Sequence, residues 1–264
     1  MGRVALALVH QELLERTRDR WVLVISGLFA LLASGVSLYG RSEELTATRL
    51  IGPSLVTLAS LFVPLVALIL GHDAVVGERE RNTLGLLLSL PVRRFEVILA
   101  KFVGRLLALG GAIGLGLGAA VLFASAENRA VLLQLILPTL LLGAAFLSIG
   151  VLLSTLVSRQ LTSASLVVAT WFLLVFFYDL GLLGLMVVTD GQVAPETIST
   201  LVTVNPAGLF RLEMMQRFAG PDVLEGLGVG VAPPGSAATI GLWTLWILAP
   251  VASSSLILTL KKVT

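Results

Sequence analysis

The hydrophobic residues of this chain fall into long, unbroken apolar stretches. Six of these stretches have 20 residues or more, which is about the length that an α-helix needs to cross the hydrocarbon core of a bilayer. They cover residues 21–40, 50–70, 102–124, 131–157, 162–188 and 239–260. None of them alternates between apolar and polar positions as the strands of a membrane barrel do. The pattern therefore predicts an all-α, polytopic membrane protein with about six transmembrane helices.

The composition points to the same class. Hydrophobic residues make up 56% of the 264 residues and charged residues only 13%, whereas soluble domains carry about 25% charged residues. So few charged side chains cannot cover a globular surface, and a lipid bilayer is the expected environment. The formal net charge is only +2, so we expect no nucleic-acid partner.

The basic residues predict the orientation. If the N-terminus is cytoplasmic, thirteen of the 18 lysines and arginines fall on the cytoplasmic side and five on the outer side. Because basic loops stay in the cytoplasm, we expect both termini inside, in a bacterial inner membrane. Tyr39, Gly40 and Arg41 follow the first apolar stretch without a small-residue cleavage site, which favours an uncleaved helix over a secretory signal.

Two segments outside the spans also have a predicted structure. Residues 3–20 combine leucines with Arg16, Arg18 and Arg20, a pattern typical of a helix on the inner membrane surface. Residues 189–238 form a long outer loop, for which we expect one or two short amphipathic helices at the outer surface.

The inner loop over residues 73–101 is the most informative segment. It begins with a charged run, and either Asn82 or Thr83 can then cap a short helix. Leu84, Leu87 and Leu88 follow at helical spacing, and Pro91 forces a turn before a basic entry into the next helix. Such an element presents an apolar face rimmed by charge, which suits docking into a groove of a soluble partner.

This loop resembles the hallmark segment of ABC-2 type permeases. The resemblance rests on Glu78, Glu80, Thr83, Leu84, Leu87, Pro91, Arg93, Glu96 and Lys101, and it departs at Asn82, where the family commonly has glycine. In that family the loop sits on the ATPase subunit. The resemblance therefore implies an ATPase-coupling site at Glu78, Glu80, Thr83, Leu84, Leu87, Pro91, Arg93 and Arg94. It also implies a single permease domain over residues 1–264 and a separate cytoplasmic ABC ATPase.

Three further segments resemble one branch of the family, the branch that supports copper-centre assembly in nitrous oxide reductase. They are residues 60–77, 171–180 and 205–211. The resemblance implies a homodimer, a cytoplasmic ATPase of the NosF kind, a periplasmic partner of the NosD kind and a sulfur species as cargo. Two alternatives stay open, namely an exporter of another cargo such as a lipid, drug or ion, and a structural anchor for a periplasmic complex.

Asp179 is a carboxylate inside a predicted span, and intramembrane ionisable residues are functional candidates. Together with Tyr178 it is a candidate for the translocation path or the outer gate. A structural hydrogen bond and a position among the outer headgroups are the alternatives. Gly110, Gly114 and Gly118 recur at four-residue spacing, which lets another helix pack closely, within the subunit or between two copies.

Several chemistries have no support in the sequence. There is no cysteine, and His10 and His72 have no neighbouring ligand cluster, so we expect no metal site. Met214 and Met215 point in different directions on a helix, which favours packing over copper binding, and His72 and Asp73 suit a capping or interfacial role. The chain carries no GxxxxGK[ST], HExxH or GxSxG motif. We therefore expect a transporter subunit that is not an enzyme and has no cofactor, with ATP and Mg²⁺ bound by the partner ATPase.

Overall fold

The computed structural model describes residues 2–17, 27, 30, 45–123, 126–219 and 235–260. In these ranges all regular secondary structure is helical, which confirms the all-α prediction. The helices are α1 (Arg3–Thr17), α3 (Leu45–Gly71), α4 (Val76–Glu80), α5 (Leu84–Leu88), α6 (Arg94–Phe123), α7 (Ala126–Leu156), α8 (Gln160–Phe172), η1 (Leu173–Phe177), α9 (Tyr178–Val188), α10 (Pro195–Val204), α11 (Pro206–Ala219) and α13 (Ser236–Leu260).

Five described segments are long and apolar enough to cross a membrane. They are Pro53–Glu80, Arg94–Leu122, Leu132–Leu156, Gln160–Val188 and Ser236–Leu260. They coincide with five of the six predicted apolar stretches, so these five are confirmed as helices. The sixth predicted stretch, residues 21–40, lies outside the described residues except for Gly27 and Ala30.

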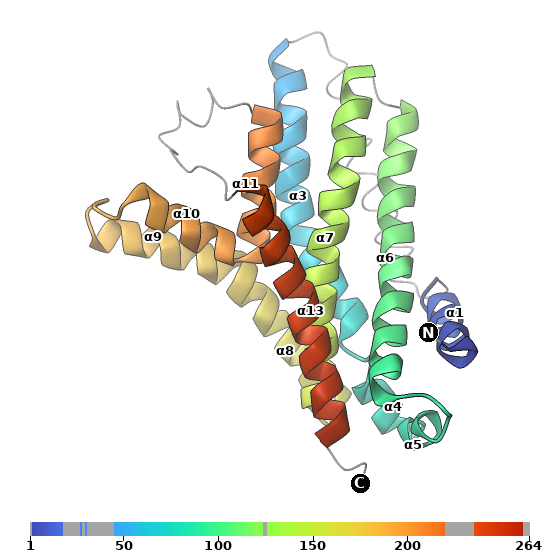
Figure 1. The fold of residues 1–264 in the computed structure, drawn as a ribbon. Helices are drawn as coiled ribbons and strands as arrows, with labels where there is room; N and C mark the ends of the chain where they lie inside the picture. The colour runs from blue at the N-terminus through green and yellow to red at the C-terminus, as the bar shows by residue number, and fades with distance from the viewer. Residues whose placement is uncertain are drawn as a thin grey trace.

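Helices α3, α6, α7 and α13 run side by side as a bundle, and α11 lies along α3 (Figure 1). The α7 span is the most enclosed of the five, with 72% of its 18-residue apolar window buried. Helices α3 and α7 approach closely through two glycines, since a Cβ atom on Gly150 would lie 3.0 Å from Cα of Gly71 and 2.9 Å from the carbonyl oxygen of Leu68. Only glycine permits this crossing, and the sequence did not single out either residue.

The predicted glycine stripe on α6 does not coincide with the closest helix contacts. A Cβ atom on Gly110 would lie 3.3 Å from Cδ1 of Leu140 in α7, but at Gly114 and Gly118 it would meet no described atom within 4 Å. The closest approach to α6 is instead at Gly104, where a Cβ atom would lie 2.7 Å from Cβ of Glu12 in α1. A packing role for Gly114 and Gly118 stays a prediction, and the described residues leave room for another helix there.

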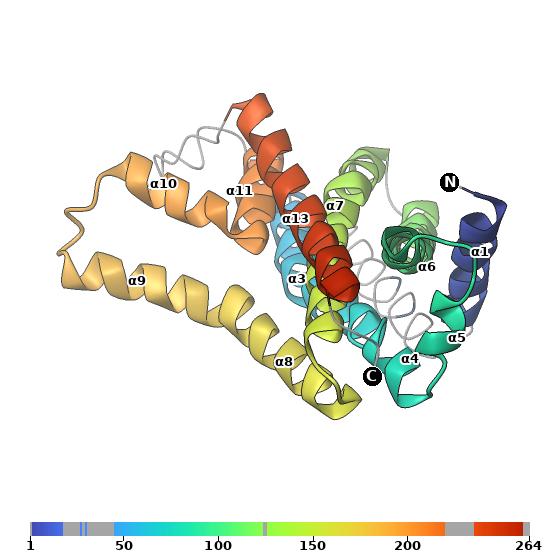
Figure 2. The same cartoon turned by 60° about the horizontal axis from the view of Figure 1, so that its bottom comes forward.

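Helices α8, η1 and α9 form one long helical segment that leaves the bundle at an angle (Figures 1 and 2). Only 6% of its 18-residue apolar window is buried. Helix α10 runs back beside α9, and α11 then returns to α3. Two short helices thus lie in the described part of the segment for which one or two were expected. Helix α11, however, buries Leu209, Phe210 and Met214 in the core, so it is part of the bundle instead of an amphipathic surface helix.

Helices α4 and α5 lie at one end of the bundle, close to the start of α6, the start of α8 and the end of α13 (Figure 1). Helix α1 packs along α6 near the same end. We call this the α4–α5 end. The inner-loop residues are therefore placed where most of the bundle helices begin or finish.

Candidate functional site

The link between α4 and α5 has an unusual backbone at one residue. Asn82 adopts φ 57°, in the left-handed region that favours glycine. Asparagine is among the few residues that tolerate this region, because its short polar side chain causes little strain there. The departure from the family pattern at Asn82 therefore keeps the turn that a glycine would make.

Thr83 precedes α5, but it does not cap the helix with its side chain. Its hydroxyl donates instead to the carboxylate of Glu78 and to the Glu78 carbonyl oxygen, the latter at 3.2 Å. The predicted side-chain cap is therefore wrong. The physical reason is that Thr83 has helical backbone angles, φ −92° and ψ −14°, whereas a capping residue has extended angles that aim its side-chain oxygen at the N–H groups of the first turn.

The apolar residues of α5 divide into two sets. Leu84 is buried, and Leu87 and Leu88 are half-buried, so the face expected to be exposed points into the protein. The exposed apolar side chains around α5 are Leu86, Leu90 and Phe95, of which Leu86 is 71% exposed. We correct the expected docking face accordingly, because a buried leucine cannot contact a partner without unfolding the element.

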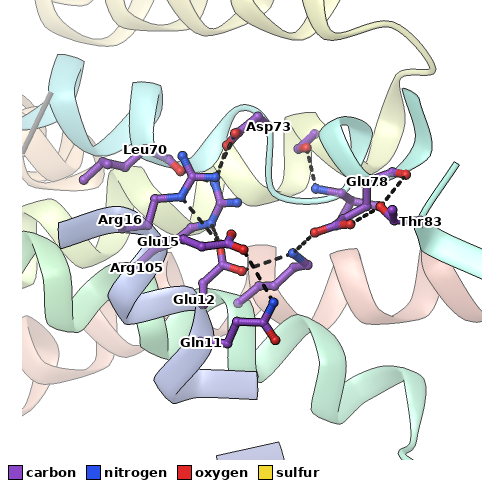
Figure 3. Close-up of polar contacts among 12 residues, drawn as sticks. Gln11, Glu12, Glu15, Arg16, Leu70, Asp73, Glu78, Thr83 and Arg105 are labelled. Carbon is purple, nitrogen blue, oxygen red and sulfur yellow. Dashed lines mark hydrogen bonds and ion pairs between the residues drawn. The ribbon is translucent and has the colours of Figure 1, made fainter. Parts of the chain in front are cut away.

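Behind α4 lies a group of charged side chains that we call the ion cluster (Figure 3). It consists of Glu12 and Arg16 from α1, Asp73 from the turn after α3, Glu78 from α4, and Lys101 and Arg105 from α6. The Lys101 Nζ atom lies 2.9 Å from Oε1 of Glu78 and 3.2 Å from Oε2 of Glu12. One lysine thus joins α4 and α1 to α6.

Arg105 is the centre of the other half of the cluster. Its Nε atom lies 2.7 Å from Oε1 of Glu12, and its Nη1 atom lies 2.5 Å from Oδ1 of Asp73 and also donates to the carbonyl oxygen of Leu70. Arg16 Nη2 lies 2.8 Å from Oδ2 of the same Asp73. Helix α1 is therefore held to the ends of α3 and α4 and to the start of α6 by charge.

Burial makes these contacts strong. The Arg105 side chain is 1% exposed and that of Glu12 is 7% exposed, and a buried charge costs several kcal/mol unless it is paired. Burial raises the pKa of Glu12, but the neighbouring charges of Arg105, Lys101 and Arg16 outweigh it and leave the pKa below its ordinary value. Glu12 is thus ionised at neutral pH and holds its partners.

A second set of contacts ties α4 to the junction of α7 and α8. The Ser154 hydroxyl oxygen accepts the N–H groups of Val75 and Val76, at 2.9 and 3.0 Å. Arg79 Nη1 donates to the carbonyl oxygen of Val157 at 2.6 Å. Glu80 Oε1 accepts the backbone N–H of Gln160, the first residue of α8, at 2.7 Å. The Glu78–Arg79–Glu80 run therefore contacts three different neighbours.

The basic entry into α6 is also bonded to other helices. Arg94 Nη1 donates to the carbonyl oxygen of Leu258, at 2.6 Å, and so satisfies an end group of α13. The Glu96 carboxylate accepts the N–H of Arg93 at 3.1 Å, which is the returning half of a capping box. Arg93 and Pro91 are exposed. The α4–α5 element is thus bonded directly to α6, α7 and α8, and α6 in turn is bonded to α1 and α13.

The sequence reasoning missed Glu12, Arg16, Asp73, Arg105 and Ser154 as parts of this site. A signal existed for some of them. Arg105 is a charge inside the apolar stretch 102–124, and it lies one helical turn after Lys101. Glu12 and Arg16 have the same spacing. A charge at such a depth needs a partner, but the pattern of one helix cannot say which helix supplies it.

Tyr178 and Asp179, the two residues proposed for the path, are the first two residues of α9. Asp179 makes a two-point ion pair with Arg211 of α11, at 2.6 and 2.7 Å. The Tyr178 hydroxyl donates to the carbonyl oxygen of Leu201 at 2.6 Å. Both residues therefore tie α9 to the α10–α11 segment. Asp179 is 37% exposed, and its place in a path stays a prediction.

Asn205 begins residues 205–211, another of the segments that resemble the family, and its side chain fixes the start of α11. Its Nδ2 atom donates to the carbonyl oxygen of Leu174 in η1 at 2.6 Å, while its Oδ1 atom accepts the N–H of Ala207 at 3.0 Å and caps α11. A Cβ atom on Gly208 would collide with the carbonyl oxygen of Val202. Among the described residues no group of three His, Asp or Glu side chains is arranged to hold a metal, and Met214 packs in the core.

The fold and this site define a class, a multi-pass helical membrane protein with a short helical element that is bonded to three neighbouring helices. Residues 6–261 match the model of the ABC-2 family transporter proteins. The chain is 36% identical over 254 residues to the probable ABC transporter permease protein NosY of Stutzerimonas stutzeri, covering 91% of this chain and 92% of the relative. It is 35% identical over 256 residues to the NosY of Pseudomonas aeruginosa, with 92% and 91% covered.

This chain belongs to the ABC-2 transporter family, and it is a permease similar to the NosY proteins. Members of this family are transport subunits and not enzymes themselves, and they work with an ATPase. The resemblance found in the loop and in residues 60–77, 171–180 and 205–211 is thus confirmed at the level of the family and of its NosY-like members.

Proposed function

We propose that this chain is the membrane subunit of an ABC transporter and that a separate cytoplasmic ATPase of the NosF kind docks on α4 and α5. The observation that carries this proposal is the connectivity of the element. Glu78 binds Lys101 of α6, Arg79 binds the carbonyl oxygen of Val157 between α7 and α8, and Glu80 binds the first N–H of α8. Leu86, Leu90 and Phe95 are exposed beside these contacts. A force applied to this surface would reach α6, α8 and the end of α7 directly, and α1 and α13 through Lys101 and Arg94 of α6. ATP and Mg²⁺ are bound by the ATPase.

The α4–α5 end lies in the cytoplasm in this proposal, with the N-terminus and C-terminus on the same side of a bacterial inner membrane. The support is the excess of lysine and arginine at this end, which includes Arg79, Arg93 and Arg94. Two copies form the permease. The α8–η1–α9 segment, whose 18-residue apolar window is only 6% buried in one chain, is the surface most open to the second copy.

The transporter supports copper-centre assembly in nitrous oxide reductase, with a periplasmic protein of the NosD kind as its outer partner and a sulfur species as cargo. The support is the similarity to NosY proteins over more than nine-tenths of the chain. Asp179 and Tyr178 act at the outer part of the path. Their bonds to α10 and α11 would have to change if the α8–η1–α9 segment moved during transport.

The experiment is complementation of a strain from which the permease gene has been deleted. The proposal expects exported nitrous oxide reductase without its mature catalytic copper centre, and full recovery when the chain is returned. A variant with Leu86 and Phe95 changed to aspartate should insert in the membrane but fail to restore the centre. Normal maturation in the deletion strain would contradict the copper-centre role and leave the broader permease role intact.

A further inference from the structure

Glu80 is the last residue of α4, and it does something that no other described carboxylate does. It accepts the backbone N–H of the first residue of another long helix, Gln160 of α8, at 2.7 Å. The first N–H groups of a helix have no partner within the helix, and a carboxylate there is favoured by the helix dipole. Arg159, the residue before α8, is extended and supplies no side-chain cap. The cap of α8 therefore comes from the α4–α5 element.

The segment that begins with α8 has few other attachments to its own bundle. Only 6% of the 18-residue apolar window in the Gln160–Val188 span is buried, against 72% of the corresponding window in the α7 span. Within α8 its described side-chain bonds to the bundle are Ser163 to the carbonyl oxygen of His72 at 2.6 Å and Trp171 to that of Leu61 at 3.0 Å. Its other bonds lie further along, in η1 and α9. A bond at its first residue therefore has a large share in setting where the segment lies.

The segment is also shaped to carry a movement along its length. The wider π-helical turn η1 lies within it at Leu173–Phe177, and such turns are frequent at functional sites. Within η1, the carbonyl oxygen of Leu174 accepts a hydrogen bond from Asn205, and beyond η1 Asp179 is paired with Arg211. A displacement of the start of α8 would thus reach α10 and α11.

We infer that Glu80 is a positioning residue that transmits the movement of the α4–α5 element to α8 through this single cap. The Glu78–Lys101 ion pair connects the same element to α6, and Lys101 in turn contacts Glu12 of α1. When the docked ATPase shifts α4 and α5, the start of α8 moves with Glu80 while α6 follows Lys101. This inference rests on the proposed docking of an ATPase at α4–α5.

The bond can be removed from either side. Glu80→Ala removes the acceptor, and Glu80→Gln keeps an acceptor oxygen without the charge. Gln160→Pro removes only the donor. Proline is well suited to the first position of a helix, and the residue before it, at φ −121° and ψ 135°, already has the extended backbone that a following proline requires. Gln160→Ala, which keeps the N–H, is the matched control, and Glu15→Ala controls for the loss of an exposed glutamate.

The measurement is a distance between spin labels on α6 and α8. The chain has no cysteine, so the labels go on cysteines placed at Leu107 and Val168, which are 51% and 45% exposed. Labelled chains are diluted with unlabelled ones, so that pairs lie within one chain. The distance distribution is recorded for the purified permease–ATPase complex, with and without ATP and vanadate, after co-purification has shown that the ATPase is bound.

In the unaltered chain and in Gln160→Ala and Glu15→Ala, ATP should shift the distance. In Glu80→Ala and Gln160→Pro the ATPase should still bind, but the shifted population should fall about tenfold, the factor expected for losing a hydrogen bond to a charged acceptor. Glu80→Gln should retain most of the shift. An unchanged shift in Gln160→Pro overturns the inference, as does loss of ATPase binding in Glu80→Ala. If the unaltered chain binds no ATPase, the proposed function itself fails.

Discussion

Lys101 of α6 lies 2.9 Å from the carboxylate of Glu78 in α4 and 3.2 Å from that of Glu12 in α1. The lysine that opens a membrane helix is thus the joint between the loop element and the N-terminal helix. Both contacts are shielded from water, because the Lys101 side chain is only 6% exposed. This relationship links the loop element to α6 and, through Lys101, to α1, which the composition of the loop alone does not reveal.

Arg105 should be essential to the fold. Its guanidinium contacts two carboxylates and one carbonyl oxygen while 1% exposed, and breaking a buried ion pair from one side costs about 3–5 kcal/mol. Arg105→Met should therefore lower the melting temperature of the detergent-solubilised chain markedly. Arg217→Met, which removes an arginine whose side chain is 47% exposed, should cost under about 1 kcal/mol. Equal shifts in the two variants would contradict the assignment of the ion cluster.

Glu12 should make the stability of the folded chain depend on pH in the acid range. Its pKa is held below the ordinary 4.5 in the folded chain, so its contribution to stability is complete above about pH 4.5 and is lost as the pH falls below that value. The melting temperature of the unaltered chain should stay nearly level down to about pH 4.5 and drop as the pH falls further. In Glu12→Gln the starting stability should be lower and the drop smaller. An identical drop in the variant would show that another group is responsible.

Substitutions of the glycines should affect folding differently at different positions. A side chain on Gly150 would meet the backbone of Leu68 and Gly71, so Gly150→Val should prevent normal packing of α3 on α7 and sharply lower the yield of folded protein. Gly114→Ala and Gly118→Ala should leave the melting temperature nearly unchanged, because no described atom lies within 4 Å of the new methyl group. If Gly114→Leu abolishes dimers in cross-linking but keeps the monomer folded, the glycine stripe packs between copies.

The Asp179–Arg211 pair should matter more for function than for stability. Both side chains are about one-third exposed, so breaking the pair should cost about 1 kcal/mol or less. Asp179→Asn should therefore melt nearly as the unaltered chain does, while nitrous oxide reductase maturation falls in a complemented strain. Arg211→Gln should give the same phenotype. Full maturation with both Asp179→Asn and Asp179→Leu would remove Asp179 from the mechanism.

The sequence predicted the helices well because a continuous apolar run of 20 residues is nearly sufficient for a membrane helix. It also located the loop element, whose residues are consecutive. It could not show that Leu84 points inward and Leu86 outward, because a five-residue helix has too few turns to define a face. It could not pair Glu80 with Gln160 or Asp179 with Arg211, since those contacts join segments 80 and 32 residues apart. Helix packing decides such pairs.

The most direct test of the account is whether the ATPase binds at the exposed side chains beside α5. Leu86→Asp and Phe95→Asp, alone and together, should leave the permease in the membrane and fully folded. They should reduce the co-purified ATPase by about tenfold or more, because a charge placed in an apolar contact loses its hydration. Leu86→Met, which keeps the apolar contact, should bind as the unaltered chain does. ATPase recovered with the double variant at the stoichiometry of the unaltered chain would contradict docking at α4–α5.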